Sequence, residues 1–180
     1  MASSMPTRQG HFKKMIGVAV RSHERDLATE FFELFKTPWE FYHAGKRYDV
    51  VISTFDDLRC EGPGLSIVFC VGPIDSQIGI KYKSNGGFVV SQEGRRLPIY
   101  GALATFPDIT QFLLREESSH LPAAVVIQSG ERTILRVGYN LFSEVNFLLT
   151  TGQPVVNAGI PTLDENISYL RDWITRAGFL

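Results

Sequence analysis

The stretch "MIGVAVRSHERDLATEFFELF", residues 15–35, decides the fold class that we predict for this chain. Its first residues, 15–21, are mostly apolar, which is typical of a buried parallel strand. Ser22 is placed to cap a helix, and apolar residues at helical spacing predict that helix over 24–36. Pro38 ends it. The stretch therefore predicts a strand followed directly by an amphipathic helix.

Two apolar segments continue this pattern: "YDVVIST" (48–54) and "LSIVFCV" (65–71). Both are rich in β-branched residues and bounded by turn-forming residues, so both predict buried strands. A strand, a helix and a strand joined by short links form a right-handed βαβ unit. We therefore expect 15–21, 48–54 and 65–71 to be adjacent, mostly parallel strands of one sheet, with the helix packed on one face.

The middle of the chain changes character. Pairs of β-prone runs are separated by short glycine-containing turns, which favours hairpins and antiparallel strands added to the parallel core. Between them the segment "DITQFLLREE" (108–117) is expected to be a short helix. The three expected turns lie at Asn85-Gly86, Glu93-Gly94 and Ser129-Gly130.

The last third of the chain reads as two helices. Asn140 can cap the first, over 141–150, and Gly152 follows its end. Thr162 and Glu165 match a capping box that opens the second. The predicted fold class is thus α/β, a single domain over 15–180 with a mixed, mostly parallel sheet and flanking helices. We expect a flavodoxin- or amidotransferase-like core plus β-hairpins, with 1–14 as a disordered tail.

Composition narrows the classes of function. The 180 residues carry a formal net charge of −1, so no basic field favours nucleic acid or an anionic membrane as partner. The longest apolar runs are far shorter than the ~20 residues of a membrane span. The two cysteines form no disulfide framework and the first residues lack a signal-peptide core. The expected location is therefore the cytoplasm.

The candidate nucleophile is Cys70, which ends an apolar run in "IVFCVGP". A cysteine at a sharp turn between a strand and a helix would resemble the elbow of amidotransferases and hydrolases. Phe69 stands next to it where the elbow needs small residues, and Pro73 interrupts the expected helix. A buried core cysteine is the better interpretation. No pair of histidines has metal-ligand spacing, so we expect neither a metal nor a cofactor.

Two strand ends share a glycine–tyrosine pattern, "PIYG" before 102 and "VGYN" before 141. Glycine at such a position allows close approach by another element or by a ligand, and packing is favoured over a ligand. Polar residues near the helix ends remain unexplained by capping, and Trp173 lies at the edge of an apolar helix stripe. The resulting candidate surface for a ligand or partner consists of Tyr100, Arg136, Tyr139, Glu144, Gln153, Asn157 and Trp173.

Three segments carry a family resemblance. "VGYNLFSEVNFLLTTGQPVVNAGIPTLDENISYLRDWI" resembles the region that precedes the catalytic domain in bacterial polysaccharide deacetylase-like proteins, and "TPWEFYHAGKRYDVVIST" and "RLPIYG" resemble earlier parts of that region. The βαβ start also resembles the amidotransferase-like α/β layer found beside such deacetylases. The family binds its catalytic metal through motifs of the T-H-D-x-D and H-x-x-x-H type, and neither is present here.

The resemblance implies a non-catalytic accessory domain whose partner is a carbohydrate-active catalytic domain C-terminal to Leu180. The domain would pack on that partner or present substrate to it. A homodimer that covers the edge marked by Trp173 is a further expectation. Two alternatives remain open: a degenerate amidotransferase-like domain that binds a small ligand, and a cysteine hydrolase that uses Cys70.

Overall fold

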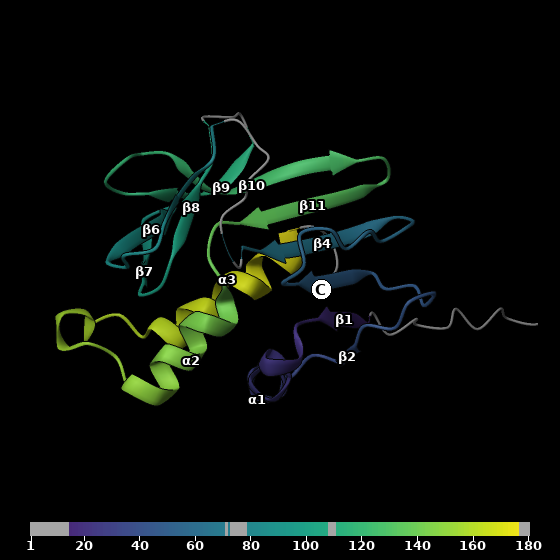
Figure 1. The fold of residues 1–180 in the computed structure, drawn as a ribbon, viewed down its shortest axis with the longest axis horizontal. Helices are drawn as coiled ribbons and strands as arrows, with labels where there is room; N and C mark the ends of the chain where they lie inside the picture. The colour runs from purple at the N-terminus through teal and green to yellow at the C-terminus, as the bar shows by residue number, and fades with distance from the viewer. Residues whose placement is uncertain (1–14, 71, 73–78, 108–110, 177–180) are drawn as a thin grey trace, which may run out of the picture.

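A computed structural model describes residues 15–70, 72, 79–107 and 111–176. The expected tail, 1–14, lies outside the described residues, as does 108–110. Within the described ranges the chain forms one mixed α/β domain around a nine-stranded sheet (Figure 1). The fold class is therefore confirmed at the level of a single α/β domain with a mixed sheet.

One half of the sheet is parallel. Its strands lie in the order β2, β1, β3, β4, β11, and every neighbouring pair among them is parallel. These strands confirm the three that the sequence predicts and add two more. Their bounds are β1 Ile16–Ala19, β2 Trp39–Phe41, β3 Val50–Ser53, β4 Gly64–Phe69 and β11 Arg132–Val137.

The other half is antiparallel and continues from β11 in the order β10, β9, β6, β7. A separate two-stranded ribbon pairs β5 with β8. The bounds are β5 Lys81–Lys83, β6 Phe88–Gln92, β7 Arg95–Ile99, β8 Leu103–Thr105, β9 Phe112–Glu116 and β10 Pro122–Ser129.

The helices gather on one face of the sheet (Figure 1). Phe142 of α2 packs against Phe31 and Phe32 of α1, and it also reaches Phe69 of β4. Each buried aromatic side chain of this cluster contributes about 1.5–3 kcal/mol through loss of water contact. The helical bounds are η1 Ser22–Glu24, α1 Arg25–Phe35, α2 Leu141–Thr151, η2 Val155–Asn157 and α3 Thr162–Arg176.

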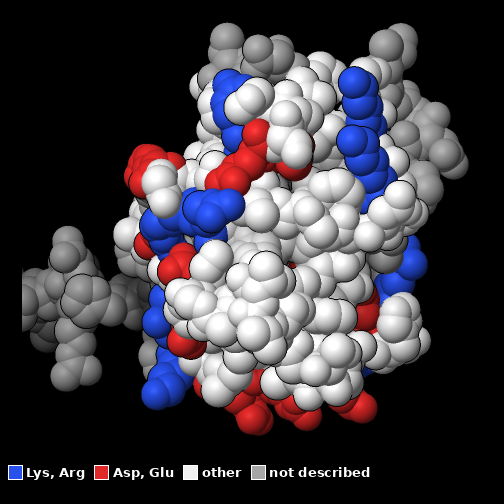
Figure 2. Space-filling model, turned by 90° about the vertical axis from the view of Figure 1, so that its left-hand side faces the viewer, with Lys and Arg blue, Asp and Glu red and all other residues white. Residues whose placement is uncertain are grey.

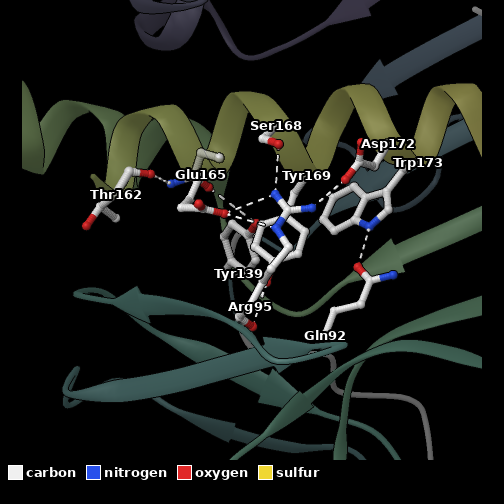
Figure 3. A network of polar contacts seen from close by, with 10 residues as sticks. Gln92, Arg95, Tyr139, Thr162, Glu165, Ser168, Tyr169, Asp172 and Trp173 are labelled. Atoms are coloured by element: carbon white, nitrogen blue, oxygen red, sulfur yellow. Dashed lines mark hydrogen bonds and ion pairs between the residues drawn. The ribbon is translucent and has the colours of Figure 1, made fainter. Parts of the chain in front are cut away.

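A polar network fixes α3 to the hairpin of β6 and β7 (Figure 3). The Arg95 guanidinium donates to Glu165, Asp172 and Ser168 on successive turns of α3. Burial lowers the pKa of Arg95, but hydrogen bonds to the two carboxylates outweigh it and raise that pKa above its ordinary value. The Tyr169 hydroxyl donates to the Arg95 carbonyl at 2.9 Å. The helix is therefore anchored through polar contacts as well as through its apolar stripe.

The predicted flavodoxin-like core agrees with the structure only in the order of its parallel strands. Numbered along the chain, the parallel strands have the order 2-1-3-4-5 that flavodoxin-like sheets share. A doubly wound sheet also places a helix in each crossover and covers both faces. Among the described residues, α1 is the only α-helix that connects two of these parallel strands.

Two of the three predicted hairpins are confirmed and one is wrong. The turn at Glu93-Gly94 is confirmed, with Gln92 paired to Arg95 and both turn residues at positive φ. The β10–β11 hairpin is also confirmed, although Ser129 pairs with Arg132, so its turn is Gly130-Glu131. The hairpin at Asn85-Gly86 is wrong, because β5 pairs with β8 and β6 pairs with β7 and β9.

Two local predictions near the helices are also wrong. The helix expected over 108–117 is strand β9 where the structure describes it, at Phe112–Glu116. Thr162 and Glu165 form no capping box: Glu165 binds Arg95, and the Thr162 amide donates to the Gln153 side chain at 3.3 Å. The Asn140 cap is confirmed, because its side chain accepts the Phe142 amide at 3.0 Å. Within the described residues, no helix is long and apolar enough to cross a membrane.

Candidate functional site

Four of the predicted surface residues meet in one network, and its centre is the Glu144 carboxylate. Glu144 lies in the first turn of α2 and is 1% exposed. Its two oxygens accept the backbone amides of Tyr100 and Gly101, each at 2.8 Å. Burial raises the pKa of Glu144, and the two N–H donors oppose that rise. The carboxylate thus holds the strand end after β7 against α2.

The Tyr100 side chain extends this network to the segment 152–161. Its hydroxyl accepts from the Asn157 amide at 3.2 Å, lies 3.3 Å from the Thr162 hydroxyl, and its ring stacks on Phe147. Gln153 holds the two ends of the segment 152–161 together, because its side-chain amide donates to the carbonyls of Asn157 and Ile160. Tyr100, Glu144, Gln153 and Asn157 therefore satisfy one another, and this arrangement braces a loop instead of forming an open site.

The glycine–tyrosine strand ends have the packing role that the sequence favoured. A Cβ on Gly101 would lie 2.8 Å from a Glu144 oxygen. A Cβ on Gly138 would lie 1.9 Å from the Ala104 carbonyl oxygen. In both cases glycine allows another element of the same chain to approach, which is one of the standard uses of that residue.

Tyr139 and Trp173, which the sequence assigned to a surface for a ligand or partner, are interior residues. Tyr139 is 1% exposed and donates its hydroxyl to Asn166 at 3.3 Å. Trp173 is 3% exposed, stacks on Tyr169, and donates its ring N–H to Gln92 at 3.4 Å (Figure 3). Sequence spacing placed Trp173 at the stripe's edge, but the β6–β7 hairpin covers that edge.

Sequence reasoning missed Glu24, which follows β1 and contacts Thr54 directly after β3. Its carboxylate accepts from the Thr54 hydroxyl at 2.7 Å, the Arg21 amide at 3.0 Å and the Asn140 side-chain amide at 3.0 Å. The residue is almost fully buried. Its own partners thus occupy both oxygens, so the carboxylate acts as a structural cross-link.

Cys70 is buried, as the sequence predicted, and its thiol donates to the Gly72 carbonyl at 3.1 Å. Burial raises the pKa of this thiol above its ordinary value. A nucleophilic cysteine needs the opposite shift, because the thiolate is the reactive form. Among the described residues, no histidine or acid is hydrogen-bonded to it. These features favour a structural role for Cys70.

A cavity with a volume of about 660 Å³ lies on the sheet face opposite the helices. Arg132, Ile134 and Arg136 alternate along β11 and line it, together with Ser66 of β4 and the segment 56–61. Arg136 is the one predicted surface residue that faces this cavity, where its guanidinium lies 3.2 Å from Asp56. The signal for Arg132 was present in the sequence, since alternate strand residues share a face.

Val155 and Val156 are the most exposed large apolar side chains of the described residues, at 90% and 88%. They lie in η2, inside the loop that Tyr100, Gln153 and Asn157 brace. The segment 152–161 contains no charged residue. Figure 2 shows a broad surface without charged side chains on the side of the molecule that carries this loop, with acidic side chains along its lower edge.

Within the described ranges, no group of three or more His, Cys, Asp or Glu side chains is placed to hold a metal ion. No family model and no curated protein matches the sequence. Similarity appears at the level of solved structures, two of which are glycosidases.

The first is an exo-β-1,4-mannosidase from an Opitutaceae bacterium, with a TM-score of 0.58 and 8% sequence identity; the match covers 89% of this chain and 36% of that one. The second is a β-galactosidase from the psychrophilic Marinomonas ef1, with a TM-score of 0.48 and 9% identity, covering 87% and 29%. The chain therefore spans about a third of the length of these proteins. At this identity the mannosidase match shows a shared fold and nothing about activity.

Proposed function

We propose that this chain is a non-catalytic accessory domain that docks on a carbohydrate-active catalytic domain through the segment 152–161. The catalytic partner is of the polysaccharide deacetylase type that the sequence resemblance implies. An amidotransferase-like origin of the parallel half is part of the same proposal, and the 2-1-3-4-5 strand order supports it.

The observation that carries the proposal is the exposure of Val155 and Val156 on a braced loop. Burying one valine side chain contributes about 1.5–3 kcal/mol, so two adjacent exposed valines forgo substantial stabilisation. Hydrogen bonds of Gln153 and Asn157 fix the loop in the shape that keeps them exposed. A pre-formed apolar projection of this kind loses little conformational entropy on binding, which favours association.

Two further observations support an accessory role. The shared fold covers only 36% of the length of the mannosidase, so in that protein the equivalent fold is part of a larger chain. The buried carboxylates of Glu24 and Glu144 both accept hydrogen bonds from groups of this chain that follow strands β3 and β7. An accessory role needs no open site at those positions.

The test is a titration of this chain against a purified polysaccharide deacetylase catalytic domain encoded with it, measured by calorimetry. We expect Val156→Asp to weaken binding at least tenfold, because a charge at the centre of an apolar contact must be desolvated. Ala44→Asp, an equally drastic change at an exposed residue of the β2–β3 connection, should leave affinity unchanged. Equal affinity of the two variants, or no binding by the wild type, would contradict the proposal.

A further inference from the structure

The cavity on the open sheet face contains a buried cation that lacks a matching anion. The Arg132 side chain is 4% exposed and extends from β11 across β4. Its guanidinium donates to the Ser66 hydroxyl at 2.6 Å and to the carbonyls of Leu65 and Pro63 at 3.1 and 3.3 Å. All three acceptors are neutral, and no described carboxylate forms an ion pair with it.

This arrangement is unusual because an ionised group removed from water is costly unless an opposite charge pairs with it. A guanidinium carries five N–H groups; three are used here, which leaves two without a partner among the described residues. Burial lowers the pKa of Arg132, while Cys60, Tyr42 and Asp49 oppose that shift. Arg132 therefore has both donor capacity and charge left for something that enters the cavity.

The rest of the cavity has complementary chemistry. Arg136 lies two positions beyond Ile134 on the same strand face, and its only ion-pair partner in the described chain is Asp56, which is about half exposed. Because water reaches the Asp56 carboxylate, an incoming anion can exchange with it. Ile134 forms an apolar floor between the two guanidinium groups. The other carboxylates of the cavity, Asp57 and Glu61, are exposed at its rim.

We propose that this cavity binds a small ligand through an oxyanion group, a carboxylate or a phosphate, held by Arg132 and oriented toward Arg136. The planar fork of a guanidinium matches either oxyanion with two parallel hydrogen bonds, whereas a neutral sugar leaves the buried charge uncompensated. The volume of about 660 Å³ lies in the range of small-molecule sites. The proposal involves residues on the face opposite the helices, so it stands or fails independently of the docking surface.

Two readouts on the whole chain test this site. Cys60 lines the cavity and is partly exposed, while Cys70 is buried, so the fast phase of thiol labelling reports on Cys60. Inorganic phosphate and glucuronate are the probes; glucose and sodium chloride at matched ionic strength are the controls. At a concentration about fivefold above Kd, an oxyanion probe should raise Tm by about 2–4 °C. It should also slow the fast labelling phase at least threefold.

The response to the two probes identifies the ligand source, since phosphate alone indicates a phosphorylated ligand and glucuronate alone an acidic sugar. Ile134→Asp places a negative charge on the cavity floor and should abolish both effects. Thr133→Asp, on the opposite face of β11, is the matched control and should retain them. Arg136→Gln, at the far end of the cavity, provides an independent variant in which both effects should weaken.

Arg132→Gln is unsuitable as the main variant, because it removes a side chain that ties β11 to β4. Three results would overturn the proposal: neither oxyanion changes Tm or labelling of the wild type, sodium chloride reproduces their effect, or Ile134→Asp and Arg136→Gln both respond like the wild type.

Discussion

At the scale of single residues, Cys70 shows how burial decides between chemistry and packing. Its thiol is enclosed at a strand end, and its raised pKa keeps it protonated. Cys70→Ala should lower the free energy of unfolding by about 1–2 kcal/mol through lost packing. Urea unfolding measures this change, and Cys60→Ala, at a partly exposed position, should stay within about 0.5 kcal/mol. Fast labelling of Cys70 in the folded protein would contradict the structural assignment.

Glu144 gives a prediction about pH. Its pKa is raised in the folded state by burial, from an ordinary value of 4.5. The folded state therefore binds the proton more tightly than the unfolded state, and stability falls as pH rises from about 4.5 through the folded-state pKa. Glu144→Gln removes that titration. The stability of the wild type relative to this variant should decline across that window in urea unfolding series.

Glu131→Gln, at the exposed tip of the β10–β11 hairpin, is the control for this comparison and should run parallel to the wild type. A wild-type advantage over Glu144→Gln that grows with pH would show that the two amide donors outweigh burial, contrary to the predicted sign.

At the scale of elements, β1, β3 and β4 were predictable because each is a mostly apolar run that is buried along its whole length. The segment 112–116 was wrongly predicted as a helix for a related reason. Its apolar run "FLL" is equally compatible with a buried helix or a strand, and the strands that pair with it determine which one forms. One partner, β10, follows β9 closely in the sequence, whereas the other, β6, lies well before it. At Asn85-Gly86 the local sequence strongly favours a hairpin turn, but β5 pairs with β8 instead of β6. No local sequence pattern reveals that pairing.

The residues of the candidate site were predictable where local sequence identifies them and were not where their role depends on distant elements. Tyr100, Glu144, Gln153 and Asn157 were identified because polar residues beside helix ends stand out in a sequence, and the structure brings them together. Their role was not visible, because each is satisfied by a residue from another element. Arg132 was missed because an arginine in a strand usually extends into water, and its burial follows from the neighbouring β4, where Ser66 and Leu65 accept its hydrogen bonds.

The contact between β11 and β8 gives a prediction at this scale. Gly138 accepts the Ala104 amide at 2.7 Å and donates to Ala123 at 2.8 Å, so three segments converge on a position without a side chain. Gly138→Ala would force a Cβ to 1.9 Å from the Ala104 oxygen and should cost about 3 kcal/mol or more. Gly159→Ala, with nothing within 4 Å of the added atom, should stay within about 0.5 kcal/mol in the same unfolding assay. Similar losses in both variants would refute the close-approach explanation.

At the scale of the whole molecule, the two faces of the sheet differ in how they are completed. Helices α1–α3 bury one face with aromatic side chains from α1, α2 and β4 (Figure 1). The other face keeps a cavity lined by Arg132 and Arg136 of β11, and a separate apolar projection stands at the end of α2. Stability, ligand binding and docking thus depend on separate sets of residues, so a substitution in one set should leave the other two properties measurable.

Trp173 tests this separation, because the sequence assigned it to a partner surface and the structure places it in the core. Trp173→Glu would bury an unpaired charge and remove a ring that packs on Tyr169, so it should cost at least about 3–5 kcal/mol in urea unfolding. Trp173→Phe keeps an aromatic ring, loses the bond to Gln92, and should cost about 1 kcal/mol. Light scattering should then give folded Trp173→Phe the same mass as the wild type, because the ring contacts only its own chain. A lower mass for this variant at equal concentration would show that Trp173 contributes to an interface between copies of the chain.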